Sequence, residues 1–93
     1  MTLHMLKLRE EYFDAVKNGV KTFEIRRADR DFKVGDTLCL TYQGSEEQMK
    51  RFAVEGIEPP KIVRYVTYIL THDDFPVGVP EGFVVMGIRR PQE

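Results

Sequence analysis

The chain has 93 residues, 42% of them apolar and 31% charged, which is enough to bury one core and excludes a disordered chain. The formal net charge of −1 excludes the strong positive field on which binding to duplex DNA or a membrane surface depends. The sequence has no bilayer-spanning apolar segment, no signal-peptide pattern and one cysteine, Cys39, so we expect residues 1–93 to form a single cytoplasmic domain.

The first predicted element is a strand over residues 3–8, where His4 and Lys7 interrupt apolar residues. Successive side chains of a strand point to opposite faces, so His4 and Lys7 are expected on different faces. A histidine near a terminus is commonly an ordinary polar residue. Both residues are therefore secondary candidates for a binding site.

A helix is predicted over residues 9–18, because acidic residues occupy its first turn and Lys17 its last, as the helix dipole prefers. Three side chains are expected on its buried side: Tyr12, Phe13 and Val16. Gly19 follows and can adopt the left-handed backbone conformation that ends many helices. The Lys21 side chain is therefore expected at a fixed corner beside the helix end.

The next predicted strand covers residues 21–27, directly after the helix. Its side chains alternate between apolar and polar types, which predicts that Phe23 and Ile25 point into the core. The polar side chains then line the opposite face of the strand: Thr22, Glu24 and Arg26.

Lys21, Glu24 and Arg26 are the main candidate site residues. Glu24 and Arg26 are two residues apart on one face, and Lys21 stands at the entrance of the strand. A carboxylate, a guanidinium and an ammonium in this arrangement suit recognition of a planar polar ligand, or proton transfer. The alternative is a ladder of solvated ion pairs with no ligand.

The middle of the chain is predicted to be a loop, a strand and a helical excursion. Alternating charges over residues 28–31 and a Gly-Asp turn indicate a loop, and residues 37–42 have the alternation of a strand. Within residues 43–60, the sequence from Ser45 to Gln48 matches a capping box, so a short second helix is expected before Gly56.

The C-terminal third is predicted to contain two strands joined by a loop. Residues 61–71 are rich in Val, Ile, Tyr and Thr, apolar on both faces, and expected to be buried on both. Residues 83–90 form the last strand, where Gly87 indicates a bulge. The order of elements predicts a mainly β (α+β) fold, a small mixed barrel with one main flanking helix.

Metal and stacking sites are weakly indicated. His4, His72 and the acidic pair Asp73 and Asp74 lack metal-ligand spacing, so we expect no metal and no cofactor. Three tyrosines could either stack on bases or pack in the core, and core packing is the more common role of such residues: Tyr12, Tyr65 and Tyr68.

The sequence over residues 12–27, with Gly19, Lys21, Thr22, Ile25 and Arg26 at its centre, followed by residues 29–38, resembles ASCH domains of the PUA-like superfamily. It is most similar to a small bacterial and phage subfamily of uncharacterised function, and only residues 43–60 depart from the pattern. This resemblance implies a PUA-like barrel with a cleft beside the helix that binds RNA or a modified nucleobase. The implied lining residues are Lys21, Glu24 and Arg26, with His4 and Lys7 as lesser candidates.

One branch of ASCH-like proteins consists of amidohydrolases of acylated cytidines that use a lysine, a threonine and a glutamate. Lys21 matches their lysine, but Glu24 stands where they have threonine, and their glutamate has no clear counterpart among Glu46, Glu47 and Glu55. A neighbouring carboxylate favours the charged ammonium, which is a poor base.

The sequence therefore leaves three functions open. The preferred one is a module that binds single-stranded RNA or a nucleoside or nucleotide. The second is an amidohydrolase that uses Lys21 and Glu24 for proton transfer, and the third is a protein-interaction module.

Overall fold

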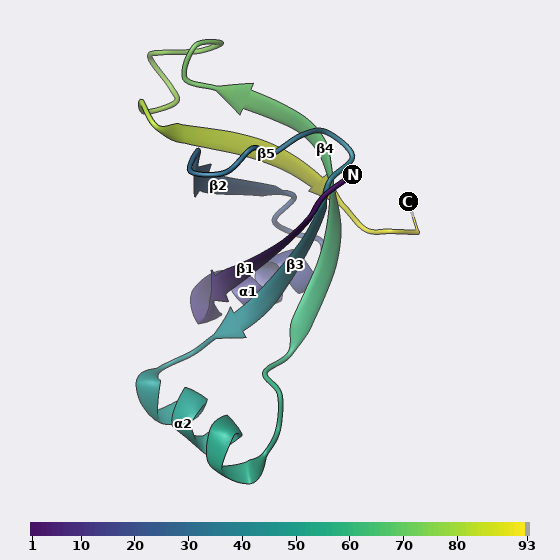
Figure 1. The fold of residues 1–93 in the computed structure, drawn as a ribbon, viewed down its shortest axis with the longest axis vertical. Helices are drawn as coiled ribbons and strands as arrows, with labels where there is room; N and C mark the ends of the chain where they lie inside the picture. Colours follow the sequence, from purple (N-terminus) through teal and green to yellow (C-terminus); the bar gives the residue numbers. More distant parts are fainter. Residues whose placement is uncertain (93) are drawn as a thin grey trace.

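The computed structural model describes residues 1–92 and contains one five-stranded sheet that curls around a helix (Figure 1). The strands are β1 (Leu3–Arg9), β2 (Phe23–Arg27), β3 (Thr37–Gln43), β4 (Lys61–Thr71) and β5 (Phe83–Arg89), and the helices are α1 (Glu10–Lys17) and α2 (Glu46–Glu55). The strand order is β1-β3-β4-β5-β2; β1 pairs with β3 in parallel and all other pairs are antiparallel. The predicted α+β class, with a small barrel-like mixed sheet and two helices, is confirmed. The second helix, α2, was expected to be the shorter one but has 10 residues against 8 in α1, and it is α1 that packs into the core.

The hydrophobic core fills the inner face of the curled sheet. Every second residue of β1 and of β5 is buried, which is the period expected for strands with one covered face. Phe13 and Val16 of α1 pack into the same core, and Phe32 of the segment before β3 contacts it from the side. The helix and this segment together cover the inner face and leave the outer face without a covering layer (Figure 1).

The long strand β4 connects the two halves of the sheet, because it pairs first with β3 and then with β5. A bulge between Val66 and Tyr68 leaves Thr67 as the extra residue without a register partner, and Tyr68 pairs with Gly87. A Cβ atom at Gly87 would lie 2.7 Å from the Thr67 hydroxyl, so any larger residue there would require the Thr67 side chain to move. The bulge expected near Gly87 is confirmed, with its extra residue in the partner strand.

The end of α1 is held by its own backbone and by a buried arginine. Gly19 has a φ of 78°, and the N–H groups of Gly19 and Val20 donate to the carbonyls of Val16 and Ala15. Arg64 on the inner face of β4 donates to the Val16 carbonyl at 2.8 Å. These bonds fix the direction in which the chain leaves α1 toward β2.

The predicted inward direction of Phe23 and Ile25 is wrong. Both side chains point outward, with exposed fractions of 44% and 54%, while Glu24 is 2% exposed on the inner side. The alternation was read correctly but its two faces were exchanged, because the inner side of this edge strand meets a polar network and the apolar core lies elsewhere. The expected burial of both faces of β4 is also wrong, since no layer covers the outer positions of Val63 and Tyr68.

Candidate functional site

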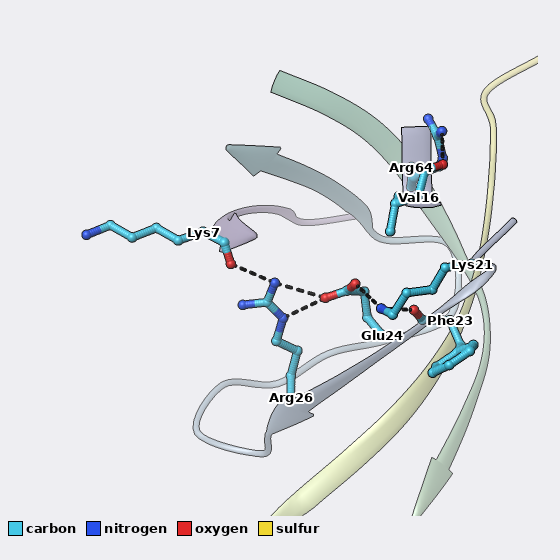
Figure 2. A network of polar contacts seen from close by, with 7 residues as sticks. All are labelled: Lys7, Val16, Lys21, Phe23, Glu24, Arg26 and Arg64. Atoms are coloured by element: carbon cyan, nitrogen blue, oxygen red, sulfur yellow. Dashed lines mark hydrogen bonds and ion pairs between the residues drawn. The ribbon is translucent and has the colours of Figure 1, made fainter. Parts of the chain in front are cut away.

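The candidate site lies where the two edge strands of the curled sheet, β1 and β2, approach each other. The strand order leaves both strands with one unpaired side. The Arg26 guanidinium of β2 crosses this seam and donates from Nη2 to the Lys7 carbonyl of β1 at 2.8 Å (Figure 2). The seam is therefore bridged by a side chain where a closed barrel would have a backbone ladder.

Glu24 is the centre of the network, and both of its carboxylate oxygens have cationic partners. Its Oε1 accepts from Lys21 Nζ at 2.8 Å, and its Oε2 accepts from Arg26 Nε at 2.9 Å (Figure 2). The Glu24 side chain is 3% exposed, whereas the Lys21 and Arg26 side chains are 17% and 21% exposed. A buried carboxylate thus holds two cations whose outer surfaces remain accessible to water.

Lys21 occupies the corner between the end of α1 and the start of β2. Its ammonium also donates to the Phe23 carbonyl at 2.7 Å, and it lies 5.3 Å from the ring centre of Tyr12 and 4.8 Å from that of Phe23. The cation is consequently fixed by a carboxylate, a carbonyl and two aromatic faces. The fixed position that the glycine-terminated helix predicted for Lys21 is confirmed.

A cleft of about 540 Å³ opens along the seam, a volume within the range of small-molecule sites. Its lining consists of residues from β1, α1 and β2: Lys7, Leu8, Arg9, Tyr12, Lys21, Phe23, Glu24, Ile25 and Arg26. Four of these side chains are cationic and one is a carboxylate, so the cleft is positive in a chain whose formal net charge is −1. Such a lining suits a ligand with phosphate or carbonyl oxygens and a planar apolar part.

The structure brings Lys21, Glu24 and Arg26 into one cluster, as the sequence predicted, and their role in ligand binding stays a prediction. Lys7 reaches the cluster through its backbone carbonyl, whereas its side chain extends away from the other residues (Figure 2). The Lys7 ammonium therefore lies apart from the cluster, and a role in ligand binding stays a prediction for this side chain.

His4 does not belong to the cleft. It is buried on the inner face of β1, where its Nε2 lies 2.8 Å from Oδ2 of Asp36 and its ring centre lies 4.6 Å from that of Phe32. Burial by itself raises the pKa of Asp36, but hydrogen bonds from His4 and from the backbone N–H groups of Thr2 and Lys33 outweigh it and hold this pKa below its ordinary value. The pair joins the start of β1 to the turn before β3, so its position indicates a structural role.

Two groups of contributors were missed from the sequence. Arg64 was treated as part of an apolar strand, although a charged residue among Ile, Val and Tyr is the signal of a buried polar contact. Arg9 and Tyr12 line the cleft because β1 runs directly into α1 at its edge. Tyr12 was assigned to the core, and with 43% of its surface exposed that assignment is wrong.

Metal and membrane chemistry receive no positive support. Within residues 1–92, no group of three or more His, Cys, Asp or Glu side chains is placed to hold a metal ion. Neither α1 nor α2, nor any other helix in this range, combines the length and the apolar character needed to cross a membrane.

Fold and site together define a small α+β protein with a curled mixed sheet and a cationic cleft at its open seam. The family model described as domain of unknown function DUF3850 matches residues 3–88, so the chain belongs to this family. The chain is also similar to the uncharacterized 12.9 kDa protein in the GpA 3′ region of Escherichia phage P2, with 47% identity over 38 residues. This match covers 41% of the chain and 35% of the phage protein.

Proposed function

We propose that this protein binds a nucleotide in the seam cleft, either as a modified nucleobase or as one unit of a single-stranded RNA. The observation that carries the proposal is the arrangement of Lys21 and Arg26 around the buried Glu24, which holds two cations in fixed positions beside a partly exposed tyrosine ring. Preorganised cations bind oxygen ligands without a further ordering cost.

Each part of a nucleotide has a complementary group in the cleft. The Arg26 guanidinium and the Lys21 ammonium are placed to donate to a base carbonyl or a phosphate oxygen. The Tyr12 ring is 43% exposed beside Lys21, and such a ring stacks readily on a base. The side chains of Lys7 and Arg9 extend the positive lining toward a neighbouring phosphate.

The resemblance of the sequence to ASCH domains of the PUA-like superfamily supports the same proposal, because that resemblance implies a cleft for RNA or a modified base beside the main helix. The chain belongs to the DUF3850 family, and we propose that it is in addition a member of the wider PUA-like superfamily. We also propose a cytoplasmic location, where the single buried thiol of Cys39 stays reduced.

Binding is favoured over amide hydrolysis by the state of Glu24. Both carboxylate oxygens already accept from cations, so a proton taken from a substrate or water has to displace one of these contacts. The threonine that supplies a hydroxyl in the acylated-cytidine amidohydrolases is replaced by this same carboxylate. The Lys21 Nζ in turn already donates to Glu24 Oε1 and to the Phe23 carbonyl, so these contacts compete with any role in activating a nucleophile.

The test is titration of labelled single-stranded RNA, and separately of N-acetylcytidine and cytidine, into wild-type protein and into Lys21→Ala. We expect saturable binding that Lys21→Ala weakens by about tenfold or more, as for loss of a charge-assisted hydrogen bond. Lys50→Ala is the matched control, because Lys50 is a strongly exposed lysine of α2 that forms a surface ion pair with Glu46 at 3.5 Å, outside the cleft lining.

Chromatography of the same N-acetylcytidine samples measures turnover. Release of cytidine that depends on Lys21 would replace the binding proposal by the amidohydrolase. Absence of both binding and turnover in the wild type would contradict both and leave the protein-interaction module.

A further inference from the structure

The outer face of β2, β5 and the second half of β4 carries aromatic side chains with no element packed over them. The backbone register places Phe23 opposite Gly87 and Gly87 opposite Tyr68, so the three residues form one row on the same face. Phe23 is 44% exposed and Tyr68 is 66% exposed. Gly87 has no side chain, and the Thr67 hydroxyl lies beside it, so the row consists of two partly exposed rings with a small polar group between them.

The next rows of this face continue the pattern. Ile25, Val85 and Leu70 stand in register beside the first row and provide an apolar base. On either side of them, an arginine lies over an aromatic ring: the Arg27 guanidinium carbon is 5.2 Å from the ring centre of Phe83, and that of Arg89 is 5.1 Å from the ring centre of Tyr65.

The charge on this face has one sign. The outward positions of β2, of β5 and of β4 from Tyr65 to Leu70 include arginines but no aspartate or glutamate, within the strands that the structure describes. Lys21 adds a third cation at the edge, 4.8 Å from the Phe23 ring. A face that combines exposed rings with cations near aromatic rings, and whose described strand positions carry no carboxylate, is complementary to a polyanion that carries flat bases.

We propose that this outer face is a stacking platform for the bases of a single-stranded RNA, with Tyr68 and Phe23 as its two ring contacts. The inference rests on the proposed function, because it extends the nucleotide of the cleft to its neighbours in the same strand. Phe23 lines the cleft and also belongs to the outer row, so one strand can pass over β2 from the cleft to the platform without a gap.

Self-association through this face is disfavoured by its charge. In a twofold dimer the same patch meets itself, so Arg27 and Lys21 of one copy would approach cations of the other, and the outward positions of the described strands supply no aspartate or glutamate to separate them. A strand of RNA supplies the missing negative charge and the flat apolar surfaces at once.

The experiment compares binding of a 3′-labelled RNA of ten nucleotides, by fluorescence anisotropy, with calorimetric binding of a mononucleotide, which tests the cleft alone. Tyr68→Ala is expected to weaken the ten-nucleotide RNA about fivefold or more, as for loss of one base–ring stack, and to leave the mononucleotide unchanged. Tyr68→Phe keeps the ring and is expected to keep the affinity. Val54→Ala, an exposed apolar change on α2, is the control.

The outcomes separate this inference from the proposed function. Unchanged RNA affinity in Tyr68→Ala, together with mononucleotide binding that Lys21→Ala weakens, overturns the platform and leaves the cleft proposal intact. If wild-type protein binds neither the RNA nor the mononucleotide, both the platform and the cleft proposal are overturned. A concentration-dependent dimer that Tyr68→Ala dissociates, measured by sedimentation, overturns the platform in favour of self-association. Tyr68 is largely exposed, so circular dichroism is expected to show an unchanged fold in each variant.

Discussion

The substitution Glu24→Gln tests the central feature of the cleft, the buried carboxylate between two cations. Glutamine preserves the shape of the side chain but removes both ion pairs, and its amide nitrogen would have to face Lys21 or Arg26, which are donors themselves. Loss of one partner of a fully buried pair costs about 3–5 kcal/mol. The two cations here retain 17% and 21% exposure, so water screens part of the effect, and we expect a loss of about 2 kcal/mol in unfolding free energy.

Urea denaturation followed by circular dichroism measures this loss, and in a domain of 93 residues it corresponds to a decrease in Tm of roughly 8–16 °C. The control is Glu58→Gln, because the Glu58 side chain is 85% exposed and its ion pair with Lys61, at 3.3 Å, lies at the surface. A loss below about 0.5 kcal/mol for Glu24→Gln, equal to that of the exposed control, would show that the network is not formed in solution and would refute the reasoning.

Three further substitutions test the elements that position the cleft. Gly19→Ala is expected to destabilise the protein by about 1–2 kcal/mol, since φ is 78° there, and an unchanged thermal midpoint would contradict the proposed end of α1. Arg64→Met removes the hydrogen bonds from the guanidinium to the Val16 and Lys17 carbonyls, while the Gly19 N–H still donates to Val16, so we expect a loss of about 1 kcal/mol in urea denaturation together with weaker RNA binding. The pKa of Asp36 lies below its ordinary value of 3.8, so its contribution to stability is present above that pH and is lost as the pH falls through the lower folded value. The difference in unfolding free energy between wild type and Asp36→Asn should therefore shrink on acidification below about pH 4. A difference that stays constant through this pH range would contradict stabilisation by an ionised Asp36 that is hydrogen-bonded to His4.

The proposed route of RNA assigns different tasks to residues that lie close together. In the proposed complex Lys21 and Arg26 contact the ligand and Glu24 holds them in position, so the Glu24→Gln substitution should affect both stability and affinity. Tyr68 lies outside this network, and its substitution should affect affinity for the longer RNA alone. The pattern across these variants therefore distinguishes a binding surface from a structural ion-pair cluster.

Local patterns in the sequence were sufficient to predict the elements. The capping box at Ser45 places the start of α2, and both of its predicted hydrogen bonds are present. The β-branched run of residues 61–71 coincides with β4, and Gly19 ends α1 as expected. Helix ends and strand periods depend on contacts within a few residues, so the sequence contains them directly.

The sequence also grouped the main candidate residues correctly, because they are neighbours in the chain. Lys21, Glu24 and Arg26 lie within six positions, and a helix end followed by a strand leaves few ways to arrange them. The sequence did not show that His4 lies outside the cleft. His4 and Asp36 are 32 positions apart, and their pairing follows from the parallel contact of β1 with β3.

Tertiary structure alone decided which face of each strand is covered. The alternation of side chains along a strand places Phe23 and Ile25 on one face and Glu24 on the other. It does not say which face is buried, because burial depends on the layer that packs against the sheet. Here α1 and the segment before β3 cover the inner face, so the aromatic residues of β2 and β4 became an exposed surface. The hydrogen bond from Arg26 to the Lys7 carbonyl, which bridges the seam, likewise arises only when the curling of the sheet brings two distant edges together.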